Sequence, residues 1–169
     1  SGVGTVWVAP VRGGAAPRIV SGIDGKGDVV VEEVDRTRLV VTQGATWVGH
    51  LEGARFVRHF QVLGSQPTLS WDETRVAYVD ATGRADSAHW KVHVWVADAE
   101  SGRAREMGLP DDVTSVDSLL WESAADLLVQ VTTEDATVEH YAWVRCAVDT
   151  GSCEIATEFD TQMPSLPLR

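Results

Sequence analysis

One short pattern occurs four times in this chain, as Thr5-Val6-Trp7-Val8, Ala45-Thr46-Trp47-Val48, His93-Val94-Trp95-Val96 and Tyr141-Ala142-Trp143-Val144. Successive tryptophans of the pattern are 40, 48 and 48 residues apart. A nearly constant spacing in this range is typical of repeat proteins in which each repeat forms one small β-sheet. The pattern therefore predicts an all-β chain made of successive units of one kind.

The residues around each tryptophan predict antiparallel hairpins. A glycine follows every copy of the pattern, at Gly13, Gly53, Gly102 and Gly151. After it the chain becomes apolar or β-branched again, as expected for two strands joined by a short turn. A second hairpin is predicted upstream of three copies. There, Asp35-Arg36-Thr37-Arg38 aligns with Asp72-Glu73-Thr74-Arg75, and Trp71 aligns with Trp121.

Each complete unit is thus predicted to be a four-stranded antiparallel meander, the size of one propeller blade. The predicted units are a partial blade at 5–21 and complete blades at 28–63, 67–108 and 115–158, followed by a C-terminal tail at 161–169. The fold class expected from the sequence is all-β, a β-propeller-type array of about three and a half blades belonging to a larger propeller. The first unit lacks two strands, so we expect self-association or additional upstream blades.

Three segments resemble bacterial TolB-like and WD40-like β-propellers. They are Pro67-Thr68-Leu69-Ser70-Trp71-Asp72 with its continuation to Val79, Ala99-Glu100-Ser101-Gly102 and Val148-Asp149-Thr150-Gly151. The resemblance covers about residues 5–158 and implies blade architecture, without indicating one activity. Because the sequence shows no catalytic constellation, we expect a non-catalytic extracytoplasmic binding or protein-interaction scaffold. The alternative is part of a propeller-class enzyme, such as a glycosidase, lyase or peptidase-associated domain, whose catalytic residues lie largely outside this chain.

Composition restricts the possible partners. The 169 residues are 44% hydrophobic and 23% charged, as in an ordinary globular domain. The formal net charge of −11 disfavours binding to nucleic acid or anionic lipid, which need a basic surface. The sequence contains no run of 18 apolar residues, so we expect no transmembrane helix. The expected partner is therefore a protein or glycan, which the sequence does not identify.

The chain has two cysteines, Cys146 and Cys153, on either side of the predicted turn of the last hairpin. If this turn centres on Asp149-Thr150, the two cysteines face each other and can form a disulfide. A three-residue turn with a bulge at Gly151 would instead place Cys146 opposite Glu154. We expect the disulfide, and with it a secreted or cell-envelope protein, because disulfides persist in oxidising compartments.

The candidate ligand-binding residues are Asp86, His89 and Trp90. They belong to an insertion between the second and third strands of the middle complete blade, and long loops of this kind often carry binding residues. The alternative is that Trp90 only covers a blade edge.

No catalytic, cofactor or metal site is expected, because the sequence contains no nucleophile elbow, Walker loop, dinucleotide fingerprint or HExxH motif. His89 and His93 have helical ligand spacing but lie on a loop and a strand. Asp24-Gly25-Lys26-Gly27-Asp28 has lysine where a calcium loop needs a carboxylate.

Overall fold

The computed structural model describes residues 6–9, 16–23, 29–35, 38–82, 91–135 and 137–167. These residues form β-strands, turns and extended segments, with no helix among them. Consequently, no helix in the described chain is long and apolar enough to cross a membrane. The expectation of an all-β chain with successive antiparallel sheets is confirmed.

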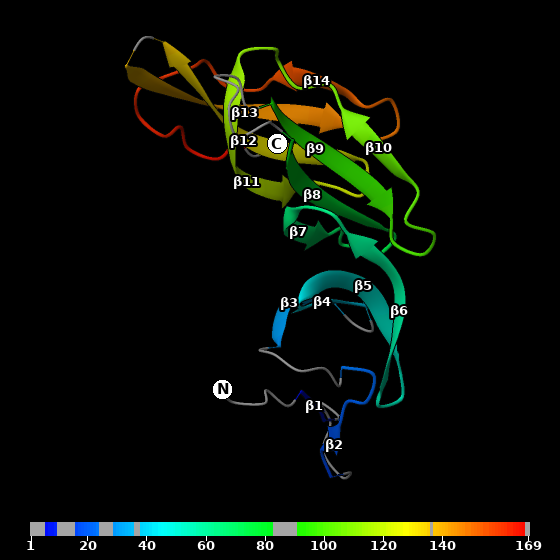
Figure 1. Cartoon of the computed structure of the whole chain (residues 1–169). Coiled ribbons are helices and arrows are strands. Elements are labelled where there is room, and N and C mark those ends of the chain that lie inside the picture. The colour runs from blue at the N-terminus through cyan, green and yellow to red at the C-terminus, as the bar shows by residue number, and fades with distance from the viewer. Residues whose placement is uncertain are drawn as a thin grey trace.

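The described strands form four antiparallel sheets, which we number 1 to 4 along the chain (Figure 1). Sheet 1 contains β1 (Trp7–Val8) and β2 (Arg18–Ile19). Sheet 2 contains β3 (Val30–Asp35), β4 (Arg38–Gln43), β5 (Ala45–Glu52) and β6 (Arg55–Val62). Sheet 3 contains β7 (Ser65–Leu69), β8 (Arg75–Thr82), β9 (Lys91–Asp98) and β10 (Ala104–Met107). Sheet 4 contains β11 (Val113–Trp121), β12 (Asp126–Asp135), β13 (Val138–Ala147) and β14 (Ser152–Ile155).

Sheets 2, 3 and 4 are meanders, in which strands adjacent in the sequence are adjacent in the sheet. The third and fourth strands of sheets 3 and 4 are joined by the same turn. Its last residue is Gly102 in one sheet, with φ of 71°, and Gly151 in the other, with φ of 77°. Each glycine donates its N–H to the carbonyl at the end of the third strand, Asp98 or Ala147. The left-handed backbone conformation favours glycine at this position.

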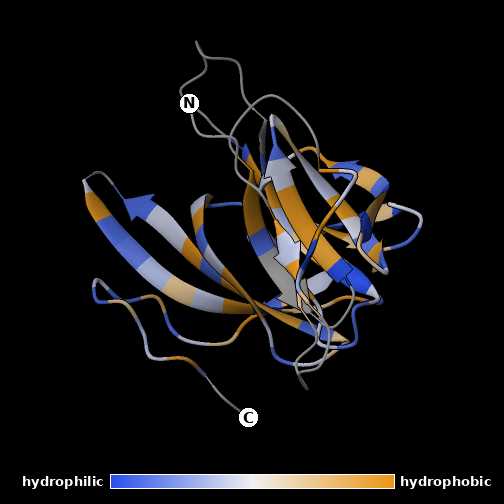
Figure 2. Ribbon diagram, turned by 90° about the horizontal axis from the view of Figure 1, so that it is seen from below, coloured by the Kyte–Doolittle hydropathy of each residue, from blue (hydrophilic) through white to orange (hydrophobic). Residues whose placement is uncertain are grey.

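The core consists of successive interfaces between neighbouring sheets, and Figure 2 shows hydrophobic residues running along the strands. Val8 and Val20 of the first unit pack with Phe56 of sheet 2. At the next two interfaces the earlier sheet again contributes valines, such as Val48 between sheets 2 and 3 and Val96 between sheets 3 and 4. Strands covered on both faces lose the alternation of polar and apolar residues, which explains the apolar runs in the sequence.

The four tryptophans of the pattern are not equivalent in the structure. Trp47 and Trp95 both lie on the face of their sheet that is directed toward the preceding sheet, because Val48 and Val96 next to them pack on the following sheet. Trp143 lies on the opposite face, since Val144 packs toward sheet 3. Gly102 follows Trp95 by seven residues, whereas Gly151 follows Trp143 by eight. Because side chains alternate between the two faces of a strand, this one-residue difference places the two tryptophans on opposite faces.

The alignment of Trp71 with Trp121 is also wrong. Trp121 is the last residue of β11 and pairs with Leu127, whereas the corresponding last pair of β7 and β8 is Leu69 with Val76. Leu69 is therefore the equivalent of Trp121, and both are buried. Trp71 belongs to the following turn and is 68% exposed. The sequence comparison matched residue type, while the hydrogen-bonded register decides which positions correspond.

The C-terminal tail covers the outer face of the last sheet. Tyr141 exchanges backbone hydrogen bonds of 2.7 and 3.1 Å with Asp160. The indole N–H of Trp143 donates to the carbonyl of Pro164 at 3.2 Å. Trp143 is accordingly only 5% exposed. No described sheet closes on itself, and sheets 1 and 4 lie at opposite ends of the stack in Figure 1.

Candidate functional site

The predicted ligand residues Asp86, His89 and Trp90 lie outside the described residues. Their segment connects β8 to β9 and ends directly before Lys91, the first residue of β9. The structural description of this side of sheet 3 therefore begins at Lys91.

Lys91 and His93 line a cavity of about 410 Å³, together with Glu106 and Met107 of β10 and Asp111 of the connection to β11. Met107 is only 2% exposed, whereas Lys91, Glu106 and Asp111 are exposed. A cavity of this volume that combines apolar side chains with a few charged groups is a candidate ligand site. Residues 106–111 were not predicted, because no motif distinguishes them from an ordinary strand end.

His93 and Glu106 form the best-defined polar contact of this cavity. His93 Nδ1 lies 2.5 Å from Glu106 Oε1, and the two residues come from neighbouring strands of sheet 3. Because the Glu106 carboxylate accepts a hydrogen bond from Nδ1–H, Nε2 is the ring nitrogen that remains available to a further partner. The arrangement holds the imidazole in a fixed orientation at the cavity wall. His89, which the sequence analysis considered with His93 and rejected as a metal-binding pair, lies outside the described residues.

A second polar cluster joins sheets 2 and 3 at another edge. Arg38 donates to the Ala99 carbonyl at 3.0 Å and to Glu100 Oε2 at 2.8 Å. This hydrogen bond from Arg38 is the main reason that the pKa of Glu100 lies below its ordinary value. His59 lies between the same groups, with its Nδ1 3.4 Å from Arg38 and 3.2 Å from the Glu100 carbonyl.

The same contact recurs between sheets 3 and 4. Arg75, the equivalent of Arg38 at the start of its strand, donates to Asp149 Oδ1 at 2.7 Å and to the Ala124 carbonyl at 3.0 Å. The shared Asp-x-Thr-Arg sequence indicated that Arg38 and Arg75 are equivalent. It did not indicate that each arginine hydrogen-bonds to the next sheet. We interpret both arginines as structural contacts between neighbouring sheets, because each one donates hydrogen bonds to acceptors on the next sheet.

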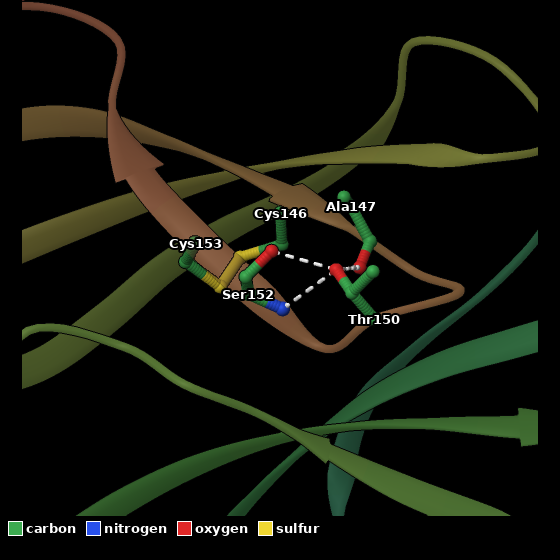
Figure 3. The surroundings of a disulfide bond; sticks show 5 residues. All are labelled: Cys146, Ala147, Thr150, Ser152 and Cys153. Carbon is green, nitrogen blue, oxygen red and sulfur yellow. Dashed lines mark hydrogen bonds between the residues drawn. A yellow bond between two sulfur atoms is a disulfide. The ribbon is translucent and has the colours of Figure 1, made fainter.

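Cys146 and Cys153 form a disulfide across β13 and β14 (Figure 3). They are directly paired in the register, so the arrangement with Glu154 opposite Cys146 is not the one adopted. The adjoining turn is further organised by Thr150, whose hydroxyl lies 2.6 Å from the Ser152 hydroxyl and accepts from the Ser152 N–H at 3.2 Å. The disulfide thus lies beside an ordered turn.

Among the residues that the structure describes, no three histidine, cysteine or acidic side chains are grouped so that they could hold a metal ion. The segment Asp24–Asp28, considered above as a calcium loop, lies outside these residues. No protein-family model matches the chain, and no curated protein is significantly similar to it.

Proposed function

We propose that this chain is a non-catalytic binding module with β-propeller-type architecture, related to the TolB-like and WD40-like repeats that its sequence resembles. It binds a protein or glycan ligand at the cavity formed by β9, β10 and the connection before β11, which we call the β9–β10 cavity. The observation that carries this proposal is that Lys91 and His93 line the cavity and directly follow the predicted ligand segment.

The chemistry of the cavity supports a polar ligand. Lys91 supplies a cation, Asp111 supplies an anion, and the imidazole of His93 is held by Glu106. Hydroxyl groups of a sugar and backbone groups of a peptide both use donors and acceptors at close spacing. Trp90, adjacent to Lys91 in the sequence, would add a surface on which a sugar ring or an apolar side chain stacks.

We further propose that the protein functions outside the cytoplasm, in secreted form or at the cell envelope. The support is the Cys146–Cys153 disulfide, because reducing conditions in the cytoplasm disfavour structural disulfides.

Glycan and peptide arrays probed with the labelled full chain test the function. For any array hit, Lys91→Ala and Asp111→Ala should each weaken binding at least about tenfold, the equivalent of 1.4 kcal/mol. The matched controls are Arg18→Ala and Glu158→Ala, which alter exposed charges outside the cavity lining. Equal binding by the cavity variants and the controls would show that the ligand binds elsewhere. Turnover of an array ligand would favour the enzyme alternative.

A further inference from the structure

The first hairpin, β1 with β2, occupies the position of the third and fourth strands of a four-stranded sheet. Ser21, just after β2, forms a parallel bridge with Arg55, the first residue of β6. Gly108, just after β10, forms the same kind of bridge with Ser152, the first residue of β14. The end of β2 therefore meets sheet 2 as the end of β10 meets sheet 4, so β2 is a fourth strand and β1 is a third strand.

The orientation of Trp7 agrees with this assignment. Val6 and Val8 pack toward sheet 2, so Trp7 between them faces away from it. Trp47 and Trp95, in the third strands of sheets 2 and 3, face away from the following sheet in the same manner. Trp7 is 58% exposed, and its neighbour across the hairpin, Ile19, is 55% exposed.

One edge of β1 carries backbone groups directed away from β2. The Val20 N–H donates to the Val6 carbonyl at 2.9 Å, which makes Val6 and Val20 a hydrogen-bonded pair. Pairs alternate along antiparallel strands, so the N–H and C=O of Trp7 point to the other edge. In sheets 2 and 3 the third strand is paired at this edge, where Trp47 faces Val41 and Trp95 faces Tyr78. Among the described strands, β1 pairs with β2 alone.

The three complete sheets show what kind of strand belongs at this edge. Their second strands are β4, β8 and β12, and each has consecutive buried apolar residues. These pairs are Val40 and Val41, Val76 and Ala77, and Leu128 and Val129, of which none is more than 2% exposed. A strand in this position is covered on both faces, so its residues are apolar in succession. In a strand with one face in solvent, polar and apolar residues alternate.

We propose that the edge of β1 opposite β2, with which no described strand pairs and which we call the free edge, is a strand-addition site. Its partner is an extended segment with consecutive β-branched or aliphatic residues, which binds antiparallel to β1 in the position that β4, β8 and β12 occupy in their own sheets. Main-chain hydrogen bonds to Trp7 provide the pairing, and the apolar side chains select the segment. This surface is separate from the β9–β10 cavity, and the proposal does not depend on the function proposed for that cavity.

A labelled peptide with the sequence of residues 35–43, which contains β4, is the probe. Fluorescence anisotropy with the full chain should show saturable binding. A peptide with Val40→Pro and Val41→Pro, which cannot complete the ladder, should bind at least tenfold more weakly. In the chain, Trp7→Pro removes the N–H at the free edge and should weaken binding to the same degree. Ile19→Pro is the matched control, because it removes an N–H directed away from β1 and should leave binding unchanged.

Binding of both peptides with equal affinity, or no binding of the β4 peptide at all, would overturn the proposal. The peptide comparison uses the unmodified chain, so it decides the question even if Trp7→Pro does not fold. Sedimentation velocity provides a further test of the occupant. A dimer of the unmodified chain that dissociates in the Trp7→Pro variant would show that a second copy of the chain, and not a separate apolar strand, occupies this edge.

Discussion

At the scale of single residues, Asp98 shows how one side chain organises a turn between strands. Its Oδ1 accepts hydrogen bonds from the Ser101 N–H at 2.7 Å, the Ser101 hydroxyl at 2.8 Å and the Glu100 N–H at 3.1 Å. These bonds, with that from the Ser101 N–H as the largest cause, lower the pKa of Asp98 below its ordinary value of 3.8. Folding therefore favours the ionised form of the Asp98 carboxyl group.

We predict that Asp98→Ala lowers the free energy of unfolding by about 1 kcal/mol at pH 7. A lowered pKa in the folded state means that the stabilisation is complete above pH 3.8 and is lost as the pH falls through the lowered pKa. The difference between variant and parent should therefore shrink in urea melts as the pH is lowered below 3.8. Asp112→Ala, which alters an exposed carboxylate of the next connection, is the control and should have little effect at either pH.

The turn glycines offer a matched comparison. Gly53 and Gly151 both have positive φ, of 63° and 77°. A Cβ at Gly53 would meet nothing within 4 Å, whereas a Cβ at Gly151 would lie 3.0 Å from the Glu106 carbonyl oxygen of sheet 3. We predict that Gly53→Ala costs about 1–2 kcal/mol from backbone strain alone. Gly151→Ala should cost measurably more in the same urea melts, and equal losses would contradict a close contact between sheets.

At the scale of elements, the disulfide reinforces one hairpin of sheet 4. The two cysteines are seven residues apart in the sequence, so the closed loop is short. Cross-linking a loop of this length should contribute about 2.5 kcal/mol to stability in the chain-entropy estimate. The other two strands of sheet 4, with β12 paired directly to β13, and the packing on sheet 3 also hold this hairpin, so the fold should survive reduction.

We predict that protein purified under oxidising conditions and then denatured without reductant contains no free thiol. Titration with a thiol reagent measures this directly, and two reactive thiols per chain would contradict the bridge. Cys146→Ala/Cys153→Ala should retain the far-ultraviolet circular dichroism of the parent and unfold at lower urea concentration.

At the scale of the whole molecule, the two ends of the stack differ. The first hairpin exposes Trp7 and Ile19, whereas the tail covers the outer face of sheet 4. Arg145 also contributes to this cover. It forms a two-bond ion pair with Glu122 at 2.6 and 2.8 Å and donates to the Pro167 carbonyl at 3.2 Å. The ion pair with Glu122 raises the pKa of Arg145, so its charge persists across the accessible pH range.

We predict that deleting residues 163–169 increases self-association, because it removes the Pro164 acceptor and exposes the Trp143 ring. Exposed apolar surface of this kind favours association. Sedimentation velocity over a range of concentrations compares the truncated and full chains. Trp143→Gln in the truncated chain is the control and should suppress the added association. A truncated chain that sediments like the parent would show that the tail is dispensable as a cover.

The sequence alone was sufficient for the local features of the fold. The repeated Trp-Val strands, the turn glycines and the apolar second strands indicated antiparallel meanders in the right order, because strand pairing across a short turn depends on neighbouring residues. The sequence also placed both cysteines in one hairpin and favoured the disulfide, but it left two registers open, and the structure shows Cys146 opposite Cys153. The predicted ligand residues Asp86, His89 and Trp90 remain a prediction.

Only the tertiary structure decided the relations between sheets. It placed Trp143 on the outer face, where one added residue before the turn reverses the side chain. It brought His93 and Lys91 to the same cavity as Asp111, and it directed Arg38 and Arg75 to the sheets that follow them. These contacts join residues that are distant in the sequence and depend on how two sheets pack. A local pattern specifies which residues form a sheet, but the packing of neighbouring sheets determines which faces and turns meet.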